Sequence, residues 1–122
     1  MSRSHSLGES FSYALSGLKV AIKKEPNFRI HLTIALIAFV LAYLLNFSFY
    51  EWITVVLIST IVIVIELINT VLESLVNLVS PQIKEEAKIA KDVAAGAVFI
   101  SATSAVVIGI ILYLPKILSL FI

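Results

Sequence analysis

The sequence predicts an all-α integral membrane protein, in which an N-terminal amphipathic surface helix precedes three transmembrane helices. The composition is the first indication, because 60% of the 122 residues are hydrophobic and 14% are charged, whereas a soluble domain is about half apolar and a quarter charged. The second indication is that the apolar residues collect in long runs without charge, as they do in membrane spans. The length suits one domain, residues 1–122.

The surface helix is expected at about residues 6–24. Apolar side chains recur there at helical spacing, and polar and basic side chains fall on the other faces, which is typical of a helix lying in the membrane interface. The alternative is an ordinary helix packed on a soluble core, but the remaining sequence offers no such core. The apolar stripe consists of Leu7, Phe11, Leu15, Leu18 and Ile22.

Three spans are expected, at about residues 28–47, 51–79 and 86–114. Pro26 suits the first turn of the first span, because its missing N–H is not needed there. Residues 32–50 carry no charge, and a helix of this length is about 28 Å long, close to the thickness of one bilayer core.

Turn residues mark the ends of these spans. Residues 46–51 form the expected first turn, Ser80-Pro81 ends the second span, and Pro115 follows the third. Aromatic side chains near the far ends fit a belt at the outer interface. They are Tyr43, Tyr50, Trp52 and Tyr113.

Basic residues predict the orientation, because cytoplasmic loops carry an excess of Lys and Arg. Eight of the nine flank the same side of the proposed spans, and only Lys116 lies at the opposite side, after the third span. We therefore expect a multi-pass protein of the cell (inner, cytoplasmic) membrane with a cytoplasmic N-terminus and an external C-terminus. The eight are Arg3, Lys19, Lys23, Lys24, Arg29, Lys84, Lys88 and Lys91.

Several function classes are excluded by what the sequence lacks. The net charge of +1 provides no global field, and no basic cluster alternates with aromatic residues, so no nucleic acid is expected as a partner. The absence of Cys excludes disulfides, thiolate zinc sites and Cys nucleophiles. No GxxxxGK[ST] motif occurs, which excludes a P-loop or protein-kinase fold.

The second span carries a polar stripe of two carboxylates and two amides. With Glu51 at the outer interface, Glu66 is expected just inside the cytoplasmic leaflet and Glu73 at its headgroups, about 22 and about 33 Å along the helix. A carboxylate within a span is costly and marks a functional site by default. The alternative is a structural polar knot that fixes helix packing. Steps of three and four residues place the stripe on one face, and its members are Glu66, Asn69, Glu73 and Asn77.

Further charges are expected at the same cytoplasmic level. Lys88, Lys91 and Asp92 share one face at the start of the third span. Glu25 immediately precedes the first span. In isolation, routine interfacial charge and a helix-start acid favoured by the helix dipole explain these residues. Together they indicate a site for Mg²⁺ and polyphosphate, because Mg²⁺ is held by one or two carboxylates plus phosphate oxygens.

The third span has a small residue at every fourth position. Small side chains let helix backbones approach closely. We therefore expect this face to serve packing within the bundle or between subunits. The residues are Ala97, Ser101, Ala105 and Gly109.

Three segments together carry a resemblance to a known family. They are EPNFRIH at residues 25–31, ELINTVLE at 66–73 and AKDVAAGAV at 90–98, with Gly17 upstream. The chain resembles the prokaryotic integral-membrane diacylglycerol kinase family from about Phe11 to the end of the third span. The resemblance implies a homotrimer with active sites shared between subunits, which uses MgATP and a lipid alcohol.

The resemblance also implies residue roles. Glu66 resembles the catalytic base, and Glu25 and Glu73 resemble the metal ligands. Residues 82–84 fall where the family's loop touches ATP, and Asn77 replaces the family's usual Asp, which removes a charge. The implied ATP contacts are Tyr13, Glu25, Asn69, Glu73, Lys91 and Asp92. The implied lipid-substrate contacts are Asn27, Phe28, Arg29, Glu66 and Ala95.

Two segments indicate the branch of the family. Asn-Phe-Arg-Ile-His at 27–31 and Ala-Ala-Gly-Ala-Val at 94–98 look more like the undecaprenol kinases of Gram-positive bacteria than the diacylglycerol kinases of Gram-negative ones. Two other function classes remain as alternatives. One is a noncatalytic or weakly active assembly protein of the same fold. The other is a small proton-coupled transporter with Glu66 as proton site, which the clustering of polar residues at one membrane face disfavours.

Overall fold

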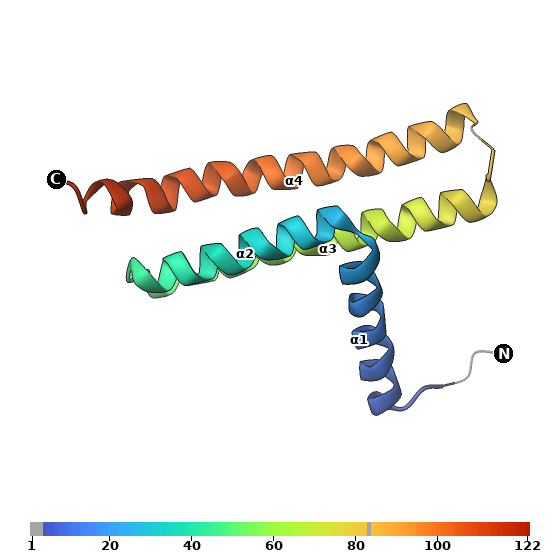
Figure 1. Ribbon diagram of the computed structural model, residues 1–122, viewed down its shortest axis with the longest axis horizontal. Coiled ribbons are helices and arrows are strands. Elements are labelled where there is room, and N and C mark those ends of the chain that lie inside the picture. The colour runs from blue at the N-terminus through green and yellow to red at the C-terminus, as the bar shows by residue number, and fades with distance from the viewer. Residues whose placement is uncertain (1–3, 83) are drawn as a thin grey trace.

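The computed structural model describes residues 4–82 and 84–122, and in them it consists of four helices joined by short turns. Three of them are long and apolar enough to cross a membrane, so the predicted all-helical class is confirmed and three helices could serve as the expected spans. In Figure 1 these three helices run alongside one another, and the first helix projects away from them at the start of α2. The helices are α1 (Leu7–Lys24), α2 (Pro26–Leu44), α3 (Phe49–Val79) and α4 (Glu85–Leu118).

Local sequence signals account for the helix starts. Ser48 and Glu51 form a capping box at the start of α3, in which each side chain accepts a hydrogen bond from the other residue's backbone N–H. Glu51 therefore belongs to the first turn of α3, which begins at Phe49, so the turn that was expected at residues 46–51 is shorter in the structure. Asn46 adopts a left-handed conformation with φ 55°, which Asn tolerates better than most residues.

The end of α4 also differs from the expectation. The third span was expected to end before Pro115, whereas α4 continues through it to Leu118. A proline inside a helix removes one backbone hydrogen bond. The Ser119 N–H still donates to the Pro115 carbonyl at 3.1 Å, so the last turn closes beyond the proline.

The bundle has two ends of different character. The polar end comprises the start of α2, the end of α3 and the start of α4, and the aromatic end comprises the opposite ends of these helices. At the aromatic end a buried cluster forms around Ala42, Phe47 and Val55. Trp52 and Tyr113 pack against this cluster, whereas the other two residues of the expected belt, Tyr43 and Tyr50, remain exposed.

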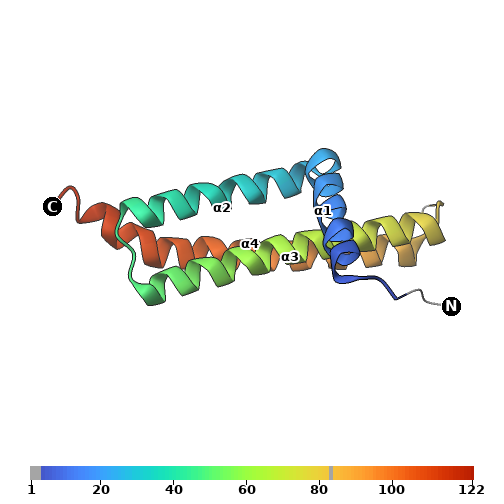
Figure 2. The same cartoon turned by 90° about the horizontal axis from the view of Figure 1, so that it is seen from below.

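The first helix leaves the bundle at the start of α2. It contacts α2 near the corner between them, and Ala21 is its buried residue. The five residues of its apolar stripe remain exposed: Leu7, Phe11, Leu15, Leu18 and Ile22. Figure 2 shows that α3 and α4 continue past the level at which α1 departs, so their polar ends extend beyond it.

Candidate functional site

The polar stripe of α3 passes from the protein interior to its surface. Glu66 is 1% exposed and Asn69 is 8% exposed, whereas Glu73 is half-buried and Asn77 is exposed. Burying a carboxylate is costly unless it is paired or has a function. The stripe therefore places its costliest group deepest in the bundle.

The buried carboxylate of Glu66 lacks a hydrogen-bond partner for one oxygen. Its Oε2 is unpartnered within the described residues, as is Oδ1 of Asn69. His31 of α2 comes near, but its Nε2 is 3.9 Å from Glu66 Oε2, which is too long for a hydrogen bond. Buried polar atoms are satisfied in the great majority of cases, so these two oxygens mark a place where a ligand atom is expected.

Two further carboxylates lie close to Glu66. Glu25 is the single residue between α1 and α2, and its side chain makes no capping hydrogen bond. Glu25 and Glu73 are both near enough to act electrostatically on Glu66. The structure thus brings the three predicted acidic residues into one neighbourhood, where their mutual repulsion favours a cation.

The described residues contain no group of three or more His, Cys, Asp or Glu side chains that could hold a metal ion by themselves. Magnesium sites in phosphate-transfer proteins commonly use only one or two carboxylates, with the remaining ligands supplied by phosphate oxygens and water. The oxygen chemistry of Glu25 and Glu73 fits such a site. Asn69 donates from Nδ2 to Glu73 Oε1 at 3.4 Å, which leaves the second oxygen of Glu73 available.

The basic side chains at the polar end are held differently from one another. Lys88 pairs with Asp92 at 2.6 Å within α4. Lys91 instead donates a hydrogen bond across to α3, to Oδ1 of Asn77 at 2.6 Å. Because Asn77 is neutral, this contact orients the Lys91 ammonium without compensating its charge.

Apart from Glu66, the four residues expected to contact the lipid substrate fall into three environments. Phe28 is 2% exposed and packs in the interior. Arg29 donates from one guanidinium nitrogen to the carbonyls of Ile22 at 2.8 Å and Lys23 at 3.1 Å, so it braces the corner between α1 and α2. The remaining two, Asn27 and Ala95, are exposed.

One expected ATP contact lies away from the carboxylates within a single chain. Tyr13 is exposed on α1, about 18 Å along the helix from Glu25, and its ring contacts the His5 ring edge-on at 5.1 Å. Residue 83, in the loop expected to touch ATP, lies outside the described residues. Arg3, one of the basic residues that predict the orientation, also lies outside them.

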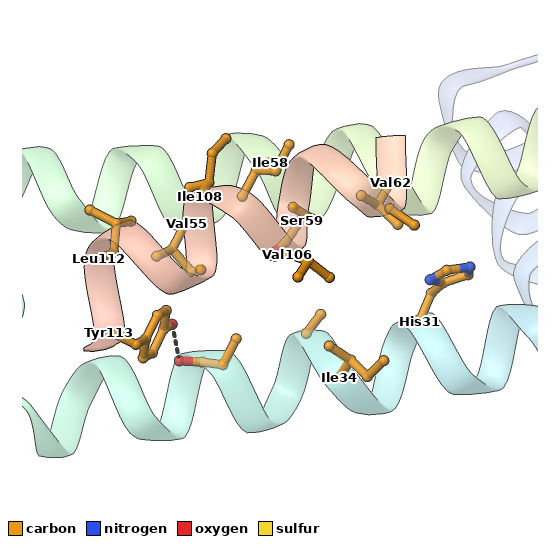
Figure 3. Close-up of a pocket in the computed structure, with 15 residues that line it drawn as sticks. His31, Ile34, Val55, Ile58, Ser59, Val62, Val106, Ile108, Leu112 and Tyr113 are labelled. Carbon is orange, nitrogen blue, oxygen red and sulfur yellow. Dashed lines mark hydrogen bonds between the residues drawn. The ribbon is translucent and has the colours of Figure 1, made fainter. Parts of the chain in front are cut away.

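A pocket of about 300 Å³ lies between α2, α3 and α4. Figure 3 shows His31 at the pocket end nearer α1 and Tyr113 at the other, where its hydroxyl donates to the Ala38 carbonyl. Two residues of the small-residue stripe, Ala105 and Gly109, line the pocket. Part of that stripe therefore leaves space where the sequence predicted close helix packing, although Ser101 is buried.

His31 received no individual role from the sequence. The signal was present, because His31 is a titratable residue within the expected first span, and such residues mark functional sites in membrane helices. The closeness of His31 to Glu66 could not be predicted, because the two residues lie on different helices and far apart in the sequence.

Three long apolar helices, with carboxylates and lysines gathered at one end, define a small membrane protein with a charged site at the end of its bundle. Residues 12–113 match the family model for prokaryotic diacylglycerol kinase, and the chain belongs to this family.

Curated relatives bear names that agree with this family. A diacylglycerol kinase of Synechocystis sp. is 43% identical over 93% of this chain, a match that covers 65% of the relative's own length. An undecaprenol kinase of Bacillus subtilis is 34% identical over 88% of each chain. A diacylglycerol kinase of Helicobacter pylori is 37% identical over 75% of this chain and 71% of its own. The family resemblance inferred from the sequence motifs is therefore confirmed.

Proposed function

We propose that the chain is a lipid kinase that transfers the γ-phosphate of ATP to the hydroxyl of a membrane lipid alcohol. The observation that carries this proposal is the Glu66 carboxylate, which is buried and has an unpartnered Oε2 near two other carboxylates. Such a group is suited to receive a hydroxyl that enters from the membrane. The family and the names of its members agree with this reaction.

Glu66 acts as the general base in this proposal. Its Oε2 accepts the hydroxyl proton while the hydroxyl oxygen attacks the γ-phosphorus and the bond from that phosphorus to the ADP oxygen breaks. The proton stays on Glu66 until it is released to solvent, and no phosphoenzyme forms. Burial of Glu66 excludes water from the acceptor position and so disfavours ATP hydrolysis.

Glu25 and Glu73 are the proposed Mg²⁺ ligands. Bound Mg²⁺ would supply positive charge that neutralises the charge on the transferring phosphate. Glu25 would hold the ion from the corner of α1 and α2, and Glu73 from the C-terminal third of α3. Lys91 contributes positive charge toward the same phosphates from α4, and Asn69, Asp92 and Tyr13 complete the proposed nucleotide contacts.

The proposed acceptor is undecaprenol in preference to diacylglycerol. Support comes from the segments at residues 27–31 and 94–98 and from the Bacillus relative, whose match covers 88% of both chains. Residues 27–29 and Ala95 are the further proposed lipid contacts, and Arg29 also holds the corner in place. Turnover of labelled ATP with undecaprenol and with dioleoylglycerol tests the preference, which is wrong if diacylglycerol is the better acceptor.

The proposed orientation puts the polar end in the cytoplasm, where ATP is available. In addition, the exposed apolar stripe of α1 would lie on the membrane surface. A single cysteine at Ser48 should react with a membrane-impermeant reagent added outside intact cells, and one at Lys84 should not. The reverse pattern contradicts a cytoplasmic ATP site.

A homotrimer is proposed as the working assembly. Tyr13 lies far along α1 from the carboxylates of its own chain, so a neighbouring subunit would supply it. Mixing an inactive Glu66→Gln subunit with a Tyr13→Ala subunit tests this arrangement. Recovery of activity on mixing supports sites shared between subunits, and no recovery contradicts them.

The decisive test of the proposed function is Glu66→Gln. The amide preserves shape but cannot accept the proton, so lipid phosphorylation should fall by about 10²–10⁴-fold while MgATP binding is retained. Glu86→Gln, at the start of α4, is the matched control. If Glu66→Gln keeps normal turnover, Glu66 is not the base. If MgATP binding and assembly are lost together, Glu66 has a structural role in helix packing and is not the base.

A further inference from the structure

The corner between α1 and α2 leaves two backbone carbonyls without a helical partner. Glu25 is extended there, with φ −109° and ψ 102°, because the residue before a proline is disfavoured in the helical conformation. The Ile22 carbonyl would ordinarily accept from the N–H of the residue four positions later, but that residue is Pro26, which has none. The Lys23 carbonyl also lies in the last turn of α1, where carbonyls lack intrahelical partners. The corner therefore requires a donor from another part of the chain.

Arg29 supplies this donor from the first turn of α2. One guanidinium nitrogen, Nη1, donates to the Ile22 carbonyl at 2.8 Å and to the Lys23 carbonyl at 3.1 Å. A cation at this place also interacts favourably with the negative end of the helix dipole of α1. The side chain thus caps the preceding helix and ties its end to the start of α2, at the corner that Figure 2 shows.

Arg29 also holds the backbone of Glu25 from the C-terminal side. The Arg29 N–H donates to the Glu25 carbonyl at 3.2 Å, and the Glu25 N–H donates to the Ala21 carbonyl at 2.9 Å. Together with the two guanidinium bonds, these contacts enclose Glu25 in a hydrogen-bonded loop between residues 22 and 29. The Glu25 side chain makes no capping hydrogen bond, so its carboxylate is available to a ligand while its backbone is held.

We propose that Arg29 is a positioning residue for Mg²⁺, which acts by fixing the direction in which the Glu25 carboxylate leaves the corner. This inference rests on the proposed function, in which Glu25 and Glu73 hold the ion. Placement matters for this ion because Mg²⁺ demands near-ideal octahedral geometry. Glu73 needs no comparable brace, since it lies within a continuous helix, whereas Glu25 is the single residue between two helices.

The first test is the Mg²⁺ dependence of lipid phosphorylation at saturating undecaprenol in mixed micelles. Arg29→Gln should raise the Mg²⁺ concentration for half-maximal rate by about five- to tenfold, because two hydrogen bonds to the corner are lost. High Mg²⁺ should restore most of the rate of Arg29→Gln but not that of Glu25→Gln, which removes the ligand itself. Arg29→Lys keeps the charge on a shorter side chain, so its Mg²⁺ requirement should lie between those of Arg29→Gln and the wild type.

The matched control for the activity test is Lys24→Gln. It removes one positive charge next to Glu25 but neither of the guanidinium bonds, which come from Arg29. Its Mg²⁺ requirement should be close to that of the wild type. If Lys24→Gln shifts the requirement as much as Arg29→Gln does, the charge near Glu25 accounts for the effect and the positioning role is wrong.

A second test measures the corner itself, without substrate or metal. The chain has no Cys, so spin labels on Ser16→Cys of α1 and Leu36→Cys of α2, both exposed, report the distance between the two helices by pulsed electron paramagnetic resonance. An excess of unlabelled subunits suppresses distances between chains. The distance distribution should be narrow with the native Arg29 and with Lys24→Gln, and broader or displaced with Arg29→Gln.

The outcomes separate this inference from the proposed function. If the wild-type protein forms no ADP in response to any lipid alcohol, the proposed function fails, whereas the distance distributions still show whether Arg29 holds the corner. If the wild type is active and Arg29→Gln keeps its Mg²⁺ requirement or its distance distribution, only the positioning role fails. A rise in KM for the lipid alone makes Arg29 a lipid contact and also overturns the role. If Arg29→Gln does not assemble, Arg29→Lys decides, and wild-type values in both measurements overturn the role.

Discussion

The two ends of the bundle use similar residue types in opposite ways. At the aromatic end Glu51 Oε2 accepts from the Ser48 N–H at 2.7 Å and pairs with Lys116 at 3.0 Å. The Lys116 ammonium also lies 5.1 Å from the centre of the Phe47 ring. This carboxylate and this ammonium are both engaged by other parts of the same chain, and the contacts join the start of α3 to the end of α4.

At the polar end the corresponding groups are left incomplete. Within the described parts of the chain, Glu66 Oε2 has no hydrogen-bond partner, and no carboxylate lies within ion-pair distance of Lys91. A fully partnered charge stabilises a fold, whereas an incompletely partnered one is available to a ligand. The comparison therefore supports the proposal that the aromatic end stabilises the fold and the polar end carries the reaction.

The largest effect is expected from removing the proposed metal ligands. Glu73→Gln and Glu25→Gln should each lower Mg²⁺-dependent lipid phosphorylation by about 100-fold or more, because bound metal supplies several kcal/mol of stabilisation to transferring phosphate. The fold should survive, since Glu25 makes no capping hydrogen bond and Gln at residue 73 still accepts from Asn69. Activity as a function of Mg²⁺ concentration is the measurement.

The control for this prediction is Glu85→Gln, which removes an acid from the first turn of α4. It should leave the Mg²⁺ dependence unchanged. If Glu25→Gln or Glu73→Gln keeps wild-type activity at low Mg²⁺, that residue is not a ligand, and the contrast between the two ends is weakened.

A smaller effect is expected from making the polar end resemble the aromatic end. Asn77→Asp places a carboxylate against Lys91 and compensates its charge. KM for MgATP should rise by up to about fivefold, the equilibrium factor that corresponds to an exposed ion pair of about 1 kcal/mol. The control is Ser74→Asp, which adds the same charge to α3 at a residue other than the hydrogen-bond partner of Lys91. An unchanged or lower KM in Asn77→Asp shows that the charge of Lys91 is not used for phosphate.

The smallest effect on activity is expected at the aromatic end. Lys116→Gln removes the ion pair with Glu51 and should lower the midpoint of thermal unfolding in detergent by a few degrees, because partly exposed ion pairs contribute little. Lys116→Arg preserves the pair and should behave as wild type. Kinase activity measured well below the midpoint should be unchanged in both variants. A large loss of turnover with unchanged stability contradicts a purely structural role for this end.

Most of the fold was readable from the sequence because its signals are local. Uncharged runs predict the spans, and helical spacing places Glu66, Asn69 and Glu73 on one face. The start of α3 is also encoded locally, by the Ser48 and Glu51 capping box, although the turn before it was expected to extend to Glu51.

The partners of the charged groups could not be read in this way. The contacts of His31 with the Glu66 region, of Arg29 with the end of α1, and of Lys91 with Asn77 depend on how helices meet. Periodicity defines the face on which a residue lies but not the element opposite that face. The pocket has the same origin, since a stripe of small residues is equally compatible with close contact and with open space.

The corner at Glu25 has a mechanical consequence. Glu25 is both the C-cap of α1 and the N-cap of α2, so no flexible linker separates the two helices. Any change in the tilt of α1 relative to α2 must be taken up by the backbone angles of Glu25 and must therefore displace its carboxylate. If α1 lies on the membrane surface as proposed, the lateral pressure and curvature of the bilayer would act on the position of this residue. The catalytic rate would then depend on the physical state of the lipid as well as on its chemical identity.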